Sequence, residues 1–321
     1  MLHTLLPANT TSVTQLRDPL ERILSAYEFS VEVAARFEGA APNDTMHDNR
    51  TLTTEVWPWS SLVPMVQHDI AKRKEEVKRG MSRSGSRPPD HPYGNKHVMS
   101  LEDFVEHPLA KELLHNGQSY QVLGITSQSY WTFAASLRSC LQQDAALHTK
   151  ASQIAAAALE RFLHVGIFER LDESLSSLAA ALRVDMALPP VVDAPPEASH
   201  QNASEADNKQ PMQSLGRSYR GCVARSRRKN AARRTSALRS LGFHDNSRLT
   251  FSAATRARIP PRTLARIREL NQVDAALYAE GQRLLSHRVA EQKERGIFKP
   301  LLEKAKLDLA TGSAPDARDE L

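Results

Sequence analysis

The segment over residues 12–34 constrains the fold most, because it is typical of a strand that turns directly into a helix. Residues 12–16 (Ser-Val-Thr-Gln-Leu) have the composition of the end of a buried strand. Asp18 and Pro19 then suit the cap and the first turn of a helix. The apolar residues that follow recur at helical spacing: Leu20, Ile23, Leu24, Tyr27, Val31 and Ala34. A strand–turn–helix unit of this kind favours parallel strands and an α/β fold.

The same alternation continues along the chain. We expect helices over residues 60–78, 101–115 and 145–162, and Ser100 is expected to cap the helix over 101–115. Strands are expected over 120–126 and 164–168, and the second strand would end with a buried Phe168. Asp172 is expected to cap a further helix, and Pro260-Pro261 to open one over 260–290. The sequence therefore predicts an α/β protein with a parallel sheet core and an added α-helical C-terminal region.

Composition shifts along the chain predict its organisation. Residues 1–185 form the predicted core, interrupted at 79–97 by a flexible loop that is rich in Gly, Pro, Ser and basic residues. Five prolines and a polar run identify 186–213 as a disordered linker. A basic helical region that packs on the core is expected over 214–300, and a frayed tail over 301–321.

Arg17 and Ser25 are the strongest candidates for binding chemistry. Arg17 is predicted at the carboxyl end of a strand, where α/β sheets bind ligands, and a guanidinium there can hold a phosphate through two hydrogen bonds. Ser25 follows two turns into the helix, and its hydroxyl can face the same anion. The helix N-terminus would add N–H donors. For an isolated arginine, a surface ion pair would be the simpler interpretation.

Together these residues form the pattern Arg-Asp-Pro-x-x-Arg-x-x-Ser-x-Tyr (residues 17–27), which resembles the 3′-phosphate-binding motif of sulfotransferases. The resemblance extends to the plant-type tyrosylprotein sulfotransferases over most of residues 13–285. Its blocks are 17–37, Trp57-Pro58-Trp59 with 62–64, His115-Asn116-Gly117, Val165-Gly166 with Glu169, Tyr219-Arg220-Gly221-Cys222, Arg256-Ala257-Arg258-Ile259-Pro260 and residues 274–278.

The resemblance implies a sulfotransferase-type, P-loop-like core and an enzyme that transfers sulfate from PAPS, without a metal, to tyrosine hydroxyls of acidic secreted peptides or proteins. Arg17 and Ser25 would hold the 3′-phosphate, with Arg22, Arg256 and Arg258 as further candidates for contacts with the nucleotide. It also implies kinship with heparan sulfate 6-O-sulfotransferases, so a glycan acceptor is an alternative.

A complete enzyme of this type needs a second phosphate-binding loop and a catalytic base, both upstream of the 3′-phosphate motif. Only sixteen residues precede Arg17, and none of them forms a Gly-rich or Lys-Thr loop. We therefore expect an N-terminally incomplete chain with no identified base. His115 lies in a matching block, where a structural role is the simpler interpretation.

Several features favour the secretory lumen, in the Golgi or endoplasmic reticulum. Four Asn-X-Ser/Thr triplets are candidate glycosylation sites, at Asn9, Asn43, Asn49 and Asn202. The sequence ends with Arg318-Asp319-Glu320-Leu321, a variant of the signal for retention in the endoplasmic reticulum.

The two cysteines, Cys140 and Cys222, could form one disulfide or remain free thiols. Both lie within residues 13–285, over most of which the resemblance extends, and the resemblance favours the disulfide. No apolar run is long enough to span a bilayer, and a membrane anchor is not expected.

Charge raises a rival interpretation. The net charge is +5 and the pI is about 9.2, which suits anionic partners. Residues 217–239 carry nine arginines and lysines and no acid, as a nucleic-acid-binding module could. Tyr219 is the only aromatic residue among them, so we do not expect a nucleic-acid partner. A non-catalytic remnant is the third alternative.

Overall fold

The computed structural model describes residues 10–38, 55–79, 93, 95, 97–183, 241, 251 and 253–300 of the 321. The chain divides into two compact units. The first comprises Met1–Arg17, Gln153–Arg227 and Leu277–Ser313, and the second comprises Asp18–Ser152, Arg228–Ala276 and Ala314–Leu321. The predicted segments 186–213 and 301–321 and most of the loop at 79–97 lie outside the described residues, so those boundaries stay predictions.

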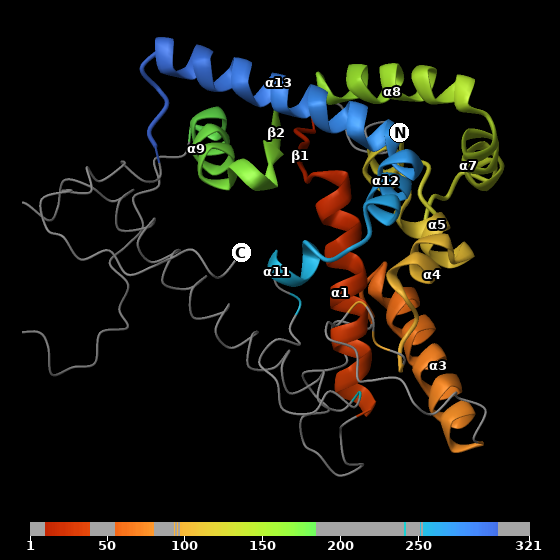
Figure 1. Cartoon of the computed structure of the whole chain (residues 1–321). Helices are drawn as coiled ribbons and strands as arrows, with labels where there is room; N and C mark the ends of the chain where they lie inside the picture. Colours follow the sequence, from red (N-terminus) through yellow and green to blue (C-terminus); the bar gives the residue numbers. More distant parts are fainter. Residues whose placement is uncertain are drawn as a thin grey trace, which may run out of the picture. The chain divides into compact units, whose positions relative to one another are not determined.

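The first unit contains a two-stranded parallel sheet, formed by β1 (Val13–Leu16) and β2 (His164–Ile167), as Figure 1 shows. Val13 pairs with His164 and Leu16 with Ile167, so both strands end at the same edge. After the short helix η4 (Phe168–Arg170), α9 (Leu171–Leu182) packs back on β2. Ser174 of α9 accepts a hydrogen bond from the Ile167 N–H at 2.8 Å and donates one to its carbonyl oxygen at 3.0 Å.

A glycine lets α13 (Gln272–Glu294), which belongs to the first unit from Leu277 onward, approach this sheet closely. A Cβ atom added to Gly281 would lie 2.6 Å from Leu16 Cδ1, 3.3 Å from Ile167 Cδ1 and 3.4 Å from Val165 Cγ1. The first of these distances is shorter than real side chains tolerate, so the helix rests on the sheet at the one position that lacks a side chain.

The second unit is helical. Its elements are α1 (Pro19–Glu38), α3 (Trp59–Lys78), α4 (Leu101–Glu106), α5 (Pro108–Leu114), α6 (Gly117–Leu123), α7 (Ala134–Gln143), α8 (Ala145–Leu159, in this unit up to Ser152), α11 (Ala253–Arg256) and α12 (Pro261–Leu270). The long helices α1 and α3 pack together (Figure 1). Tyr27 is fully buried at the centre of the core, with its ring against Tyr93, Phe104 and Phe251.

The α/β prediction is confirmed in coarse form: the described residues are mostly helical and contain a small parallel sheet. Strands are present at Val13–Leu16 and His164–Ile167, and so are the helix after Pro19 and the helix over 60–78. The prediction of Phe168 as a buried strand residue is wrong, because it follows the strand and is 49% exposed. In the strand before Arg17, predicted as buried, Leu16 is the one buried residue. Ser100 caps α4, accepting a hydrogen bond from the Asp103 N–H at 3.0 Å.

The prediction of a strand over residues 120–126 is wrong, because most of that segment lies in the buried helix α6. Tyr120 and Val122 suggested a strand, since aromatic and β-branched residues are common there. Gly124, taken as a strand interior, instead has a φ of 72° and closes α6 as a left-handed C-cap. Burial among other helices overrides the local preference.

The two long helices predicted over 101–115 and 260–290 are each divided. His107 adopts an extended conformation because Pro108 follows it, and its Nδ1 atom accepts a hydrogen bond from the Leu109 N–H. Asn271 separates α12 from α13 and turns its side-chain oxygen to the N–H of Asn116. The prediction of Asp172 as a cap is wrong: Asp172 lies inside the first turn of α9, because that helix begins at Leu171 with Arg170 as its N-cap residue.

Candidate anion-binding site

Arg17 lies at the carboxyl end of β1, as predicted. Leu16, the residue before it, is 2% exposed and pairs with Ile167, so the chain leaves the sheet at Arg17 and, on the neighbouring strand, at Phe168. The guanidinium carbon of Arg17 lies 4.8 Å from the centroid of the Phe168 ring. Arg17 therefore occupies the edge of the first unit at which parallel sheets bind ligands.

The neighbours of Phe168 are held by contacts within the same unit. Tyr278 donates a hydrogen bond to Glu169 Oε2 at 2.9 Å. Arg170 donates from Nε to Glu173 Oε2 at 2.6 Å and from Nη1 to Ser286 Oγ at 2.8 Å. These hydrogen bonds hold Glu169 and Arg170, the two residues that directly follow Phe168.

Ser25 belongs to the second unit, where it lies partly buried on α1. At the start of the helix, Asp18 Oδ1 accepts a hydrogen bond from the Glu21 N–H at 3.0 Å, which confirms the predicted cap. A carboxylate thus already occupies part of the N-terminus that was expected to attract an anion. Because Arg17 and Ser25 fall in different units, their convergence on one phosphate stays a prediction.

Arg22 interacts with protein groups. Its Nη2 atom donates to the backbone carbonyl of Leu114 and lies 3.1 Å from Asp274 Oδ2. Asp274 is fully buried and also accepts hydrogen bonds from the N–H groups of Gln118 and Ser119, at 3.2 and 2.7 Å, and from the Ser119 hydroxyl at 2.7 Å. Arg22 therefore neutralises a buried carboxylate at the start of α6.

Two of the blocks that carry the resemblance meet beside this carboxylate. Asn116, which has a φ of 52°, accepts hydrogen bonds on Oδ1 from the N–H groups of Val273 and Asp274, at 3.1 and 3.2 Å. In return, Asn271 Oδ1 accepts a hydrogen bond from the Asn116 N–H at 3.1 Å. Sequence reasoning did not reveal this pairing, because the two blocks are about 155 residues apart.

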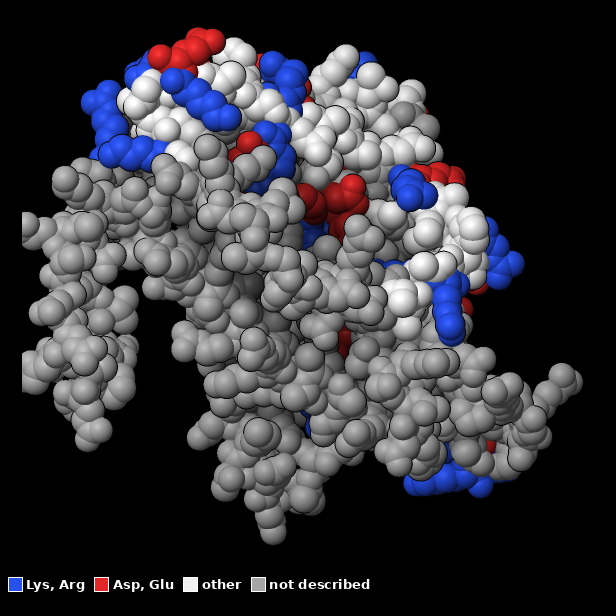
Figure 2. Space-filling model, turned by 60° about the vertical axis from the view of Figure 1, so that its left-hand side comes forward, with Lys and Arg blue, Asp and Glu red and all other residues white. Residues whose placement is uncertain are grey.

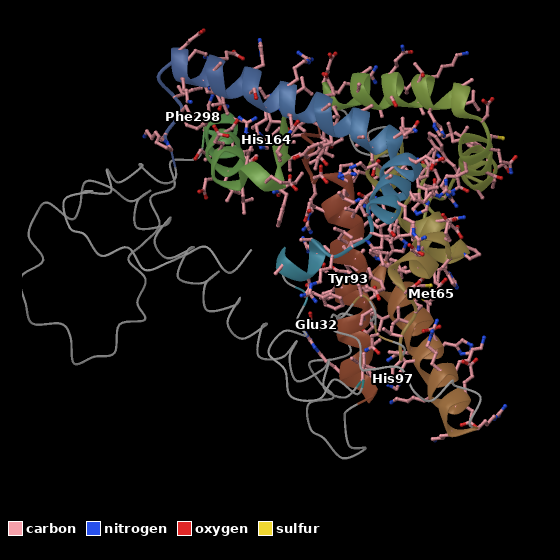
Figure 3. All side chains as sticks on the ribbon, viewed as in Figure 1. Glu32, Met65, Tyr93, His97, His164 and Phe298 are labelled. Atoms are coloured by element: carbon pink, nitrogen blue, oxygen red, sulfur yellow. The ribbon has the colours of Figure 1, made fainter. Side chains whose placement is uncertain are left out.

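Arg256 is likewise engaged within the second unit. Its Nε and Nη2 atoms each donate to a carboxylate oxygen of Glu28 at 2.7 Å, and Nη1 donates to Glu21 at 2.5 Å. The Glu28 carboxylate raises the pKa of Arg256, and Tyr93, which lies near α1 in Figure 3, also donates to Glu28 at 2.5 Å. Arg258 is exposed. Arg256 thus joins α11 to α1.

Two buried histidines have strongly lowered pKa values. Burial, with Lys111 and Arg22 nearby, lowers the pKa of His115 to about 4. Burial and then Arg288 lower the pKa of His164, on β2 (Figure 3), also to about 4. Both are neutral at physiological pH, and His115, 4% exposed, has the burial of a structural residue.

Other predicted sites lie outside the described residues. They are Asn9, Asn43, Asn49, Asn202, Cys222 and the basic stretch 217–239. Cys140 is exposed on α7, and because Cys222 lies outside the described residues, a disulfide between the two stays a prediction. Within the described ranges, no three His, Cys, Asp or Glu side chains are placed to hold a metal ion. None of the helices described is long and apolar enough to cross a membrane.

A protein from Arabidopsis thaliana named protein-tyrosine sulfotransferase is similar to this chain. The two are 28% identical over an alignment 339 positions long. The alignment covers 91% of this chain and 66% of the relative, just under two thirds of the relative's length. No protein-family model and no solved structure matches the chain. The match confirms the resemblance to the plant-type tyrosylprotein sulfotransferases that residues 17–37 and the later blocks indicated.

Proposed function

From this kinship with a plant protein-tyrosine sulfotransferase, we propose that the chain is a transferase that moves sulfate from PAPS to tyrosine hydroxyls. Its described part would contribute the 3′-phosphate-binding half of a sulfotransferase-type core. The observation that supports this most is Arg17, which directly follows a strand of a parallel pair at the carboxyl edge. Ser25 and the 3′-phosphate pattern of residues 17–27 give further support.

In the proposed reaction, a base removes the acceptor proton while the sulfuryl group passes in line from PAPS to the tyrosine oxygen. Negative charge then develops on the leaving 3′,5′-ADP, and cationic groups stabilise it. Arg17 would fix the nucleotide through its 3′-phosphate, which holds the far end of the leaving group in position. Arg22 and Arg256 bind carboxylates of the protein, so their proposed role is structural.

We also propose an acidic peptide or protein as the acceptor. The net charge of +5 supports this, as does a cavity of about 760 Å³ in the first unit whose basic lining residues are Arg183, Arg288, Arg295 and Lys299, against one acid, Glu291. Figure 2 shows a group of Lys and Arg side chains at the upper left of the described surface. Sulfate transfer to a tyrosine peptide flanked by acidic residues should exceed transfer to its neutral counterpart, and equal rates would refute the acidic preference.

We further propose that the protein works in the lumen of the secretory pathway. The support is sequence-based and rests on the four Asn-X-Ser/Thr triplets at Asn9, Asn43, Asn49 and Asn202. Removal of N-glycans by a glycosidase should increase the electrophoretic mobility of the protein isolated from its own cells. Unchanged mobility would count against the lumenal location.

Binding of 3′,5′-ADP tests the proposed function. A ligand that binds only the folded protein raises its melting temperature, so saturating 3′,5′-ADP should protect the full chain. Arg17→Ala should remove most of this protection, because losing a charge-assisted bond costs about 1.5–3 kcal/mol. Arg161→Ala is the matched control, since Arg161 is exposed in the same unit. No protection of the wild-type chain would refute the proposal.

A further inference from the structure

The face of α1 that carries Ser25 also carries a row of carboxylates. Residues 21, 25 and 28 are spaced at i, i+4 and i+7, so Glu21 and Glu28 lie about one helical turn on either side of Ser25. Glu32 continues the row and pairs with Arg36. Side chains at this spacing have Cβ atoms about 5–6 Å apart. A phosphate bound to the Ser25 hydroxyl would therefore lie close to two carboxylates.

A single arginine pairs with both of these carboxylates. Arg256 of α11, which lies beside α1 in Figure 1, donates from Nε and Nη2 to the two carboxylate oxygens of Glu28, each at 2.7 Å. Its Nη1 atom donates to Glu21 at 2.5 Å. Because the guanidinium contacts side chains from the turns before and after Ser25, it lies on the same face of the helix. All four residues belong to the second unit.

This pairing changes the charge that a phosphate would meet at Ser25. Without the arginine, two negative charges would flank the hydroxyl, and with it the three charged groups together carry one. Glu28 is only 8% exposed, so solvent screens its charge less than that of a surface carboxylate. Hydrogen bonds to Glu28 raise the pKa of Arg256, so the guanidinium stays charged at physiological pH. The arginine therefore reduces repulsion at Ser25 by acting through the carboxylates.

We propose that Arg256 is a positioning residue of the nucleotide site, which holds and partly neutralises Glu21 and Glu28 so that Ser25 can donate a hydrogen bond to the 3′-phosphate. This inference rests on the proposed function and gives Arg256 an electrostatic role in addition to joining α11 to α1. The resemblance to sulfotransferases implied a contact between Arg256 and the nucleotide. The two roles differ in what happens when the carboxylates are neutralised by mutation.

Isothermal titration of 3′,5′-ADP into the full chain at low salt tests the proposal. Glu21→Gln keeps an oxygen for Arg256 but removes one negative charge, and should tighten binding about three- to tenfold. Arg256→Gln leaves both carboxylates unpaired and should weaken binding by a similar factor. Adding Glu28→Gln to Arg256→Gln restores the wild-type net charge beside Ser25, and should return the affinity to within about twofold of wild type. These shifts should shrink at about 0.5 M salt.

Arg266→Gln is the matched control. It breaks another arginine–carboxylate pair of the second unit, with Glu106 of α4, and should leave the affinity for 3′,5′-ADP unchanged. Weakening as large as that in Arg256→Gln would contradict a local effect at Ser25. Urea unfolding shows whether each variant is folded, and Glu21→Gln decides the question even where Arg256→Gln is unfolded.

The outcomes separate this inference from the proposed function. Unchanged affinity in Glu21→Gln would overturn the role of Arg256, and so would a folded Arg256→Gln/Glu28→Gln variant that binds as weakly as Arg256→Gln. Either result would leave the proposed function standing, provided that the wild-type chain binds 3′,5′-ADP and Arg17→Ala weakens that binding. If the wild-type chain does not bind 3′,5′-ADP, the proposed function itself fails.

Discussion

At the scale of single residues, the candidate arginines differ in the groups that they contact. Arg22 and Arg256 each contact carboxylates within the second unit. Arg17 lies at the sheet edge of the first unit, with its guanidinium carbon 4.8 Å from the centroid of the Phe168 ring. A place in a resembling block therefore does not by itself predict that an arginine binds a ligand.

Asp274 should be essential for stability. Asp274→Ala leaves the Arg22 guanidinium partly buried without its carboxylate partner and breaks four hydrogen bonds. We expect a loss of about 3–5 kcal/mol in the free energy of unfolding, measured by urea denaturation. Asp172→Ala, at an exposed position of α9, is the control and should cost about 1 kcal/mol or less. A loss of similar size in both variants would contradict the assigned role of Asp274.

The buried histidines should make the protein less stable in mild acid. Their pKa values of about 4 in the folded state lie below the unfolded value of about 6.5. Between these values the unfolded chain binds more protons, so stability should fall as the pH drops from about 6.5 to about 4. His115→Gln should flatten this dependence in urea melts across that range, whereas His287→Gln, on the exposed side of α13, should not. Parallel profiles for both variants would argue against this cause.

The sequence predicted the position of some site residues and missed others. The position of Arg17 followed from a local strand–turn–helix pattern, which needs only neighbours in sequence. Glu28, Asp274 and Phe168 were missed because their partners lie far along the chain, as with Arg256 for Glu28 at a separation of 228 residues. No spacing pattern encodes such contacts.

At the scale of elements, the fold could be predicted where local pattern and burial agree. Helix α1 has strong periodicity and a clear cap at Asp18, and it formed as expected. Strands β1 and β2 also formed close to the predicted positions. Helix α6 did not, because its β-branched and aromatic residues are buried in a helical unit that the sequence does not reveal locally. The break at His107 follows from Pro108, a local signal that the predicted long helix overlooked. The break at Asn271 includes a side-chain hydrogen bond to Asn116, which lies 155 residues away.

Close packing of α13 on the sheet leads to a prediction at this scale. Gly281→Val should force the Leu16 side chain and the helix apart, with a cost of about 1–3 kcal/mol in the free energy of unfolding. Gln282→Val introduces the same β-branched residue at the next, exposed position and should cost less than 1 kcal/mol. Equal losses in the two variants would show that helix propensity, and not contact with the sheet, governs this position.

At the scale of the whole molecule, the two strongest candidate residues, Arg17 and Ser25, belong to different compact units. Arg17 is the last residue of the first segment of the first unit, and the second unit begins at Asp18. Ser25 is carried by α1 of the second unit. That both side chains bind one 3′-phosphate is a prediction from the sequence pattern, and it needs a test of its own.

A double-mutant cycle on nucleotide affinity tests this convergence most directly. We would titrate 3′,5′-ADP into the wild-type chain, Arg17→Ala, Ser25→Ala and the double variant. Residues that hold one phosphate should be coupled by about 0.5 kcal/mol or more, so the double variant should lose less than the sum of the single losses. Losses that add within about 0.3 kcal/mol, or a Ser25→Ala variant with wild-type affinity, would contradict a shared 3′-phosphate site.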